Sequence, residues 1–235
     1  MFIDKYFSES EGRIRFTREQ GSRFAKEVAD DFNPLHDADA KRFCIPGDLL
    51  FAVVLARYGI SQHMQFTFSG MVLEDTELLL PEPAGHLLIR DAQGRDYLDI
   101  VRGGEGSVDE ALIQNLTRNY VAFSGHTFPH ILEPLLAGAN VIINPARPMV
   151  MYVSMTIDLD RLDVQNPVLV GGDHKIDIDG KRGNVELRFN LVEEGEVVGR
   201  GAKKLVLGGL REYDEDTMAA AIADFDQRKE SYFAS

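Results

Sequence analysis

Three patterns of apolar and polar positions follow one another in the first hundred residues. Thr17 and Gln20 form a capping box, and the apolar positions behind them recur on one face of an expected helix. Residues 49–56 are apolar without interruption, which predicts a helix buried on every side that ends near Tyr58-Gly59. From Met64 onward apolar and polar residues alternate, as in antiparallel strands. The strands are expected at residues 65–71, 78–80, 86–90 and 96–102.

The same order begins again after Gly103-Gly104-Glu105-Gly106, a run that we interpret as an interdomain hinge. Ser107 to Glu110 forms a second capping box, 90 residues after the first, and its helix runs towards Tyr120. A second apolar helix is expected within residues 127–139, with Pro134 kinking or ending it. Further strands are expected at residues 149–159, 168–170, 175–178, 185–191 and 197–207. The repeated order predicts an internal duplication.

This order of elements favours an α+β fold in which each sheet wraps round an apolar helix. We expect an N-terminal unit at residues 1–104, a C-terminal unit at 105–210 and a final helix within 211–235. The final helix has Met218 and Phe225 on one face. It would pack on the sheet or on a partner chain, and the second arrangement would make the protein a homodimer.

Composition narrows the class of protein. The chain of 235 residues has 25 basic and 38 acidic residues and a net charge of −13, which argues against nucleic acid and anionic membranes as partners. No apolar run is long enough for a membrane span, and residues 1–10 have no apolar signal core. The single cysteine, Cys44, fits a buried, inert thiol in a reducing compartment. We therefore expect a soluble cytoplasmic protein, and the scattered histidines predict no metal site.

The segment from Asp31 to His36 carries the chemistry. Pro34 fixes its own φ and pushes Asn33 out of the helical region, so the chain turns between the two ionisable residues. An Asp and a His five positions apart on such a turn can share one water, which is an arrangement for general acid–base catalysis. In the plainer alternative, Asp31 and Asn33 cap a helix end and His36 lies on the surface.

A second feature lies a few residues further on. Pro46 and Gly47 open the buried helix, and the N-terminus of such a helix offers unpaired N–H groups and the positive end of a dipole. Gly47 would let a ligand approach this terminus closely. The sequence thus places an acid–base pair just before a site suited to a negatively polarised oxygen.

These residues carry a family resemblance. Phe24-Ala25, the segment Asp31–His36, and Ile45-Pro46-Gly47 with the apolar helix resemble the MaoC-like, or R-specific enoyl-CoA hydratase, branch of the hotdog superfamily. Asp30 stands where the family pattern usually has glycine, and Ala38-Asp39 replaces its acidic-proline step. The resemblance implies a double hotdog with a working N-terminal half and a degenerate C-terminal half.

The resemblance also implies an activity. It is the R-specific hydration of trans-2-enoyl-CoA, or the dehydration of 3-hydroxyacyl thioesters, with an acyl-CoA or acyl-carrier thioester as substrate and no cofactor. Asp31 and His36 would be catalytic, and the backbone N–H of Gly47 would polarise the thioester carbonyl. Asn33 and Pro46 would shape the substrate-binding loop, Asn33 by hydrogen bonds to its own backbone.

Two other functions stay open. One is a non-catalytic hotdog protein that binds acyl thioesters or another small ligand, in which Asp30 and Ala38 mark a site that has drifted. The other is a hotdog thioesterase, whose carboxylate would lie on the central helix, where Asp48 is available. An assay of enoyl-CoA turnover separates the hydratase from the binding protein.

Overall fold

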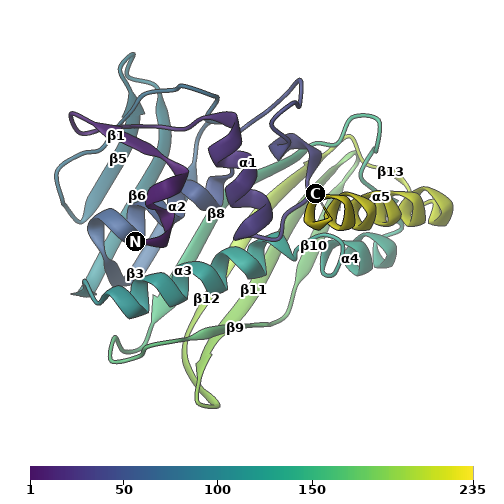
Figure 1. The fold of residues 1–235 in the computed structure, drawn as a ribbon. Coiled ribbons are helices and arrows are strands. Elements are labelled where there is room, and N and C mark those ends of the chain that lie inside the picture. Colours follow the sequence, from purple (N-terminus) through teal and green to yellow (C-terminus); the bar gives the residue numbers. More distant parts are fainter. Residues whose placement is uncertain (235) are drawn as a thin grey trace.

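The structure is a computed structural model that describes residues 1–234. One antiparallel sheet of eleven strands runs through both halves of the chain, and helices lie against one of its faces (Figure 1). Within residues 1–234, no helix has both the length and the apolar character needed to span a bilayer.

The N-terminal half begins with a short 3-10 helix and a hairpin, and then places two α-helices before its four remaining strands. Its elements are η1 (Phe2–Tyr6), β1 (Ser8–Ser10), β2 (Arg13–Arg15), α1 (Arg18–Glu27), η2 (Pro34–His36), α2 (Gly47–Tyr58), β3 (Ile60–Phe68), β4 (Leu78–Leu79), β5 (His86–Asp91) and β6 (Asp96–Ser107).

The C-terminal half begins with two helices, continues with strands and ends with a long helix. Its elements are α3 (Glu110–Gly125), α4 (Leu132–Gly138), β7 (Val141–Ile142), β8 (Val150–Leu159), β9 (Val168–Gly171), β10 (Lys175–Asp179), β11 (Arg182–Glu193), β12 (Glu196–Gly208), β13 (Arg211–Glu212) and α5 (Glu215–Phe233).

Both halves connect their strands in the same order. From the centre of the sheet outward, the N-terminal half runs β3, β6, β5, β4 and the C-terminal half runs β8, β12, β11, β10. The two innermost strands, β3 and β8, pair antiparallel, with Met64 opposite Ile157. The strand order therefore confirms the predicted α+β double hotdog, whose two half-sheets join edge to edge.

Helix α2 lies at the centre of the core because its residues are apolar on every side. The side chains of Leu49–Leu55 are at most 2% exposed. The ring centroid of Phe51 lies 4.7 Å from that of Tyr120 on α3, so the two helices share one core. The helix ends at Tyr58, as predicted, and Gly59 follows with a φ of 72°. Burying each large apolar side chain contributes about 1.5–3 kcal/mol, so this helix supplies much of the core's stability.

The expected hinge at Gly103–Gly106 is wrong, because this run continues strand β6. Gly103 pairs opposite His63 and Gly106 opposite Ser61, with an irregularity between them. Gly104 takes up the irregularity with a φ of 75°, and a Cβ there would lie 2.9 Å from the Cβ of Gln62. The division of the chain at residue 104 falls inside this strand, and the division into units stays a prediction.

Only the first of the two predicted capping boxes forms. The Thr17 hydroxyl accepts the N–H of Gln20 at 3.2 Å, and the Gln20 side chain accepts the N–H of Thr17 at 2.9 Å. Helix α3 is capped instead by Asp109, which accepts the N–H of Leu112 at 2.8 Å. Because β6 extends through Ser107, the helix begins later than the pattern indicated.

The second apolar helix is short. Pro134 neither kinks nor ends it, because α4 begins at Leu132 and the proline lies in its first turn, where the missing N–H costs nothing. The buried Leu132 and Leu136 face a second core cluster, together with Leu187, Leu207 and residues of α5. The long helix α3, and not α4, packs against α2 in the main core.

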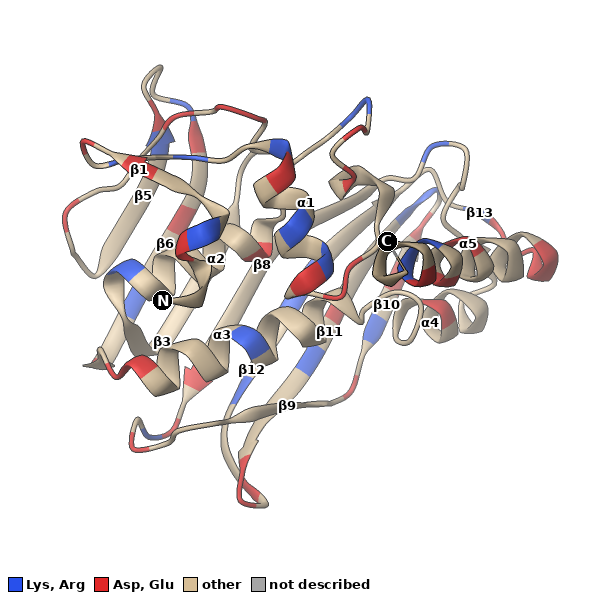
Figure 2. Ribbon diagram, viewed as in Figure 1, with Lys and Arg blue, Asp and Glu red and all other residues tan. Residues whose placement is uncertain are grey.

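Helix α5 confirms the predicted apolar face at the end of the chain. Met218 and Phe225 are 3% and 9% exposed. Charged residues of both signs occur along this helix, as they do along α1 (Figure 2). The helix lies beside α4 and close to the segment that follows α1 (Figure 1).

Candidate active site

The segment after α1 is held in a fixed turn by its own side chains. Asp31 Oδ1 accepts the N–H of Asn33 at 2.9 Å, and Asn33 Oδ1 accepts the N–H of Leu35 at 3.1 Å. Pro34 opens the short helix η2, where its missing N–H is not needed. Two successive side-chain turns thus bring His36 back towards Asp31.

The structure brings the two predicted catalytic side chains together. His36 Nε2 lies 3.7 Å from Asp31 Oδ2, with His36 12% and Asp31 27% exposed. His36 Nδ1 lies 2.9 Å from the carbonyl oxygen of Cys44. A carbonyl can only accept, so Nδ1 carries a hydrogen and Nε2 faces the carboxylate. His36 is therefore a buried partner of Asp31 and not a surface histidine.

The surroundings of His36 favour its protonated form. Burial by itself lowers the pKa of an imidazole, but the Cys44 side chain, the Asp31 carboxylate and the Cys44 carbonyl together raise the pKa of His36 to about 9. At neutral pH the ring is an imidazolium. It can donate a proton but cannot accept one.

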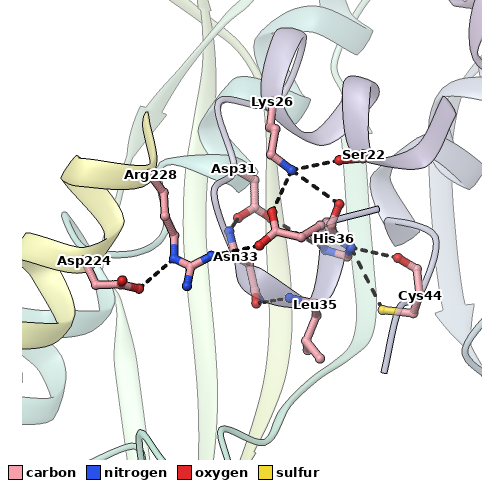
Figure 3. A network of polar contacts seen from close by, with 10 residues as sticks. Ser22, Lys26, Asp31, Asn33, Leu35, His36, Cys44, Asp224 and Arg228 are labelled. Atoms are coloured by element: carbon pink, nitrogen blue, oxygen red, sulfur yellow. Dashed lines mark hydrogen bonds and ion pairs between the residues drawn. The ribbon is translucent and has the colours of Figure 1, made fainter. Parts of the chain in front are cut away.

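A buried lysine fixes the end of the turn from the side of α1. Lys26 Nζ lies 2.8 Å from Asp37 Oδ1 and 2.8 Å from Ser22 Oγ, and 3.4 Å from the carbonyl oxygen of His36 (Figure 3). Because Lys26 is 8% exposed, this ion pair is only weakly screened by water. The backbone of the turn is thus anchored on both sides of His36.

Helix α5 holds the same turn from the opposite side. Arg228 Nη1 lies 2.8 Å from Asp37 Oδ2 (Figure 3). Lys229 pairs with Asp30. The ring of Phe32 is 1% exposed and contacts three aromatic rings of α5. These rings belong to Phe225, Tyr232 and Phe233, with centroids 5.9 to 6.0 Å from that of Phe32. The C-terminal helix therefore covers the segment that carries the pair.

The N-terminus of α2 is more covered than the sequence indicated. Pro46 caps the helix, and the N–H groups of Gly47 and Asp48 have no hydrogen-bond acceptor among residues 1–234. A Cβ on Gly47 would lie 3.1 Å from ring atoms of both Phe68 and Tyr152. The two stacked rings thus crowd the Cα of Gly47, and a side chain there would require them to shift by a few tenths of an ångström.

A buried polar cluster beside this terminus was not predicted as a unit. Lys203 Nζ donates to Ser124 Oγ, and the Ser124 hydroxyl donates to Asp48 Oδ2. The three residues are 6%, 5% and 8% exposed, and Lys203 Nζ lies 4.3 Å from the ring centroid of Tyr152. The Tyr152 and Tyr120 hydroxyls share a hydrogen bond. One sequence signal was available: Lys203 alternates with Leu205 and Leu207 and so belongs to the core face of its strand.

The cluster and the Asp31–His36 pair act on one another electrostatically. Burial raises the pKa of Asp48, while Lys203 and Ser124 oppose the rise; the charge of Asp31 adds to it and that of His36 opposes it. Burial also raises the pKa of Tyr152 well above its ordinary value, so its phenol stays protonated. One site thus contains an imidazolium, two carboxyl groups, an ammonium group and neutral phenols.

The family model described as a protein of unknown function (DUF3581) matches residues 1–216. The chain belongs to the DUF3581 family. A search of curated proteins found no match.

Solved structures resemble the DUF3581 chain at low identity. The TesB protein of Mycobacterium avium subsp. paratuberculosis is 9% identical, over 87% of this chain and 96% of that chain, with a TM-score of 0.49. An acyl-CoA thioesterase II of Mycobacterium marinum is 10% identical, over 92% and 99%, with a TM-score of 0.45. A MaoC-like dehydratase is 10% identical, over 85% and 97%, with a TM-score of 0.36. The family rests on the sequence match, and the fold on the strand order.

Two surface grooves of this DUF3581 protein lie away from the pair. One, of about 510 Å³, lies between η1 and Arg118; the other, of about 410 Å³, lies between α3 and β9. Neither is lined by Asp31 or His36. Over residues 1–234, no group of three His, Cys, Asp or Glu side chains is placed to hold a metal ion.

The family match ends at residue 216, within the first turn of α5. The contacts of Arg228 with Asp37 and of Lys229 with Asp30 therefore come from beyond the matched residues. Asp31, His36, Asp48 and the partners of Asp48 lie inside them.

Proposed function

We propose that the protein is a MaoC-like hydro-lyase that adds water to trans-2-enoyl thioesters with R specificity, or removes it from 3-hydroxyacyl thioesters. The observation that carries this proposal is the partly buried Asp31–His36 pair, whose Oδ2 and Nε2 atoms lie 3.7 Å apart. The substrate would be a thioester of coenzyme A or of an acyl carrier, and no further cofactor is required. The family resemblance of the segment supports the same reaction.

The ionisation of the pair assigns the two proton transfers. With its pKa raised to about 9, the His36 imidazolium is the acid that protonates C2. The Asp31 carboxylate is the base that takes a proton from water as the oxygen bonds to C3. After the addition, Asp31 carries a proton and His36 lacks one. Transfer between Oδ2 and Nε2 restores both groups.

The start of α2 would stabilise the thioester oxygen. Negative charge develops on this oxygen during addition, and the N–H of Gly47 lies at the positive end of the helix dipole. The rings of Phe68 and Tyr152 cover the Cα side of Gly47. The oxygen would therefore reach the N–H along the helix axis. Loss of such a donor typically costs about 3–4 kcal/mol of barrier.

A protein that binds acyl thioesters without turnover is the second candidate. The contacts of α5 with Asp30, Phe32 and Asp37 favour this candidate, because α5 covers the site, and a covered site retains a ligand more readily than it exchanges substrates. In that case Asp30 and Ala38 would mark departures from the catalytic pattern of the family.

A thioesterase is the third candidate, and Asp48 favours it. This carboxyl group lies on the central helix, is 8% exposed and has a raised pKa because of its burial. A carboxylate in this position could direct water to the thioester carbonyl instead of C3.

One experiment separates the three. Purified protein is incubated with trans-2-enoyl-CoA of short and medium chain length while the conjugated thioester and free thiol are measured together, and binding of saturated acyl-CoA is measured by calorimetry. Loss of conjugation without thiol release supports the hydro-lyase. Thiol release identifies a thioesterase, and binding without either change identifies a binding protein. If the protein neither binds nor converts the thioesters, the resemblance reflects ancestry and the proposal is wrong.

A further inference from the structure

One oxygen of the Asp48 carboxyl group is buried without a partner. Oδ2 accepts the hydrogen bond from Ser124, but Oδ1 is buried and has no hydrogen-bond partner among residues 1–234. A buried polar atom left unpaired costs about 1–3 kcal/mol, and more when it belongs to a charged group. An ion pair that served only to join α2 to the sheet would be expected to satisfy both oxygens.

The hydrogen bonds around Asp48 show which of its two oxygens acts as an acceptor. Lys203 has only donors, so the Ser124 oxygen accepts from it and the single Ser124 proton goes to Asp48. The Lys203 ammonium group also lies 4.0 Å from Asp48 Oδ2. Oδ2 therefore carries no proton, and the charge of Lys203 favours the carboxylate form of Asp48 against the burial that raises its pKa. In the carboxylate form, Oδ1 is an acceptor that needs a donor.

The position of this acceptor links it to the proposed chemistry. Asp48 follows Gly47 at the start of α2, and the charges of Asp31 and His36 both act on its carboxyl group. The other titratable groups that face it are Lys203 and the phenols of Tyr152 and Tyr120. The Tyr152 hydroxyl interacts with the Asp48 carboxyl group, and it is the group that would compete with a water for Oδ1.

We propose that Asp48 Oδ1 binds the reacting water, and that Ser124 and Lys203 of the C-terminal half are positioning residues for this carboxylate. This inference rests on the proposed hydro-lyase function. One O–H of the water donates to Asp48 Oδ1 and stays intact, while the other gives its proton to Asp31. The water oxygen bonds to C3, the electron pair of the C2–C3 double bond moves to C2, and C2 takes a proton from His36. The 3-hydroxyl of the product then keeps the hydrogen bond to Asp48.

This role involves the half of the molecule that lacks an Asp–His motif. Asp48 comes from the central helix of the N-terminal half, whereas Ser124 and Lys203 come from α3 and β12. The site would thus be completed across the junction of the two halves. The C-terminal half would contribute to catalysis and not only to the wall of an acyl pocket.

The first test does not depend on turnover. A crystal structure at a resolution that shows ordered water should contain a water molecule within hydrogen-bond distance of Asp48 Oδ1. If Oδ1 is bonded instead by the Tyr152 hydroxyl, or has no water, the inference is wrong even where hydration is observed. Failure of the proposed function appears separately, as a wild-type protein that does not hydrate enoyl-CoA.

The second test uses variants. Asp48→Asn should lower kcat for enoyl-CoA hydration by about 10²-fold or more, with a smaller change in KM. Lys203→Met should move the acidic limb of the kcat/KM profile to higher pH, because it removes the charge that opposes the raised pKa of Asp48. Lys203→Arg keeps a positive charge, so its acidic limb should lie closer to the wild-type position than that of Lys203→Met.

The matched control is Thr127→Val. This substitution removes another buried oxygen that has no partner among residues 1–234, and it should leave hydration unchanged. Circular dichroism and a thermal melt verify that each variant is folded. Ser124→Ala, which keeps both charges, replaces Asp48→Asn if that variant does not fold, and it should also lower kcat. Full activity and an unshifted pH profile in the folded variants would overturn the assignment.

Discussion

At the scale of single residues, the ionisation of His36 decides the direction of proton transfer in the proposed reaction. An imidazole of ordinary pKa near 6.5 could act as base or acid at neutral pH. The environment of His36 raises its pKa to about 9 and leaves it only the role of acid. Asp31, held by the N–H of Asn33 on its other oxygen, is then the base.

Asp31→Asn and His36→Gln should each lower enoyl-CoA hydration by about 10²- to 10⁴-fold, because each removes one of the two proton transfers. The rates are measured from the loss of the conjugated thioester. The matched control is the exposed pair His86–Asp99, whose atoms lie 3.1 Å apart on neighbouring strands. His86→Gln and Asp99→Asn should leave the rate unchanged. Wild-type rates in either catalytic variant would rule out the assigned roles.

The raised pKa of His36 also predicts how activity and stability depend on pH. Activity should decline as the pH rises through about 9, where the acid is lost. The folded pKa lies above the unfolded value, so the stability from the imidazolium is fully present below pH 6.5 and is lost as the pH rises through about 9. The shift from 6.5 to about 9 corresponds to about 3 kcal/mol.

The measurement is the free energy of unfolding in denaturant for the wild type and His36→Gln, at about pH 6 and about pH 10. The difference between the two proteins should be largest at the lower pH and should shrink at the higher one. Because the other groups that titrate over this range are the same in both proteins, their contributions to the free energy of unfolding cancel in the difference. A gap that is equal at both pH values would show that the pKa of His36 is not raised.

The residues of the site differ in how far the sequence could reveal them. Asp31 and His36 are five positions apart, so the turn alone brings them together. Lys203 and Ser124 meet across 79 positions, and no local pattern encodes that contact. The role of Gly47 in binding a ligand stays a prediction, and the sequence could not reveal the two rings that crowd its Cα, because Phe68 and Tyr152 come from β3 and β8.

At the scale of elements, the ends of strands and helices depend on partners that the local pattern does not contain. The alternation predicted a strand ending at Arg102, yet pairing with β3 carries β6 through Ser107. That extension removes the expected hinge and moves the start of α3. Helix α2 was predicted well because an uninterrupted apolar run between Pro46 and Gly59 fits a helix that is buried on every side.

The ion pair between α5 and the segment after α1 gives a prediction at this scale. Arg228→Ala should increase amide hydrogen exchange in residues 30–37, because it removes the ion pair between Arg228 and Asp37. Arg228 is 39% exposed, so the free energy of unfolding should change by less than about 1 kcal/mol. Arg161→Ala, which removes an exposed pair with Asp163, is the control and should leave exchange in these residues unchanged. Unchanged exchange in Arg228→Ala would show that α5 does not hold the segment.

At the scale of the whole molecule, the repeated strand order suggests two separate units, whereas the shared core suggests that the two halves form one. The order suggests two units, each with its own strands and helix. The core does not respect that division: the main cluster joins α2 to Tyr120 of α3 and to Met155 and Ile157 of β8. The Ser124 link between Asp48 and Lys203 crosses the same junction.

The two halves should therefore fold only together. A fragment of residues 1–107 would expose the edge of β3 that pairs with β8 and the face of α2 that packs on α3, so it should aggregate or show no cooperative thermal transition. Co-expression with residues 108–235 should restore the circular dichroism spectrum and the transition of the intact chain, because the cut lies beside the exposed Val108 and breaks no element. A monomeric 1–107 fragment that melts cooperatively by itself would show that the N-terminal unit is an independent domain. It would also show that this unit folds without the contacts that Asp48 makes with Ser124 and Lys203 of the other half.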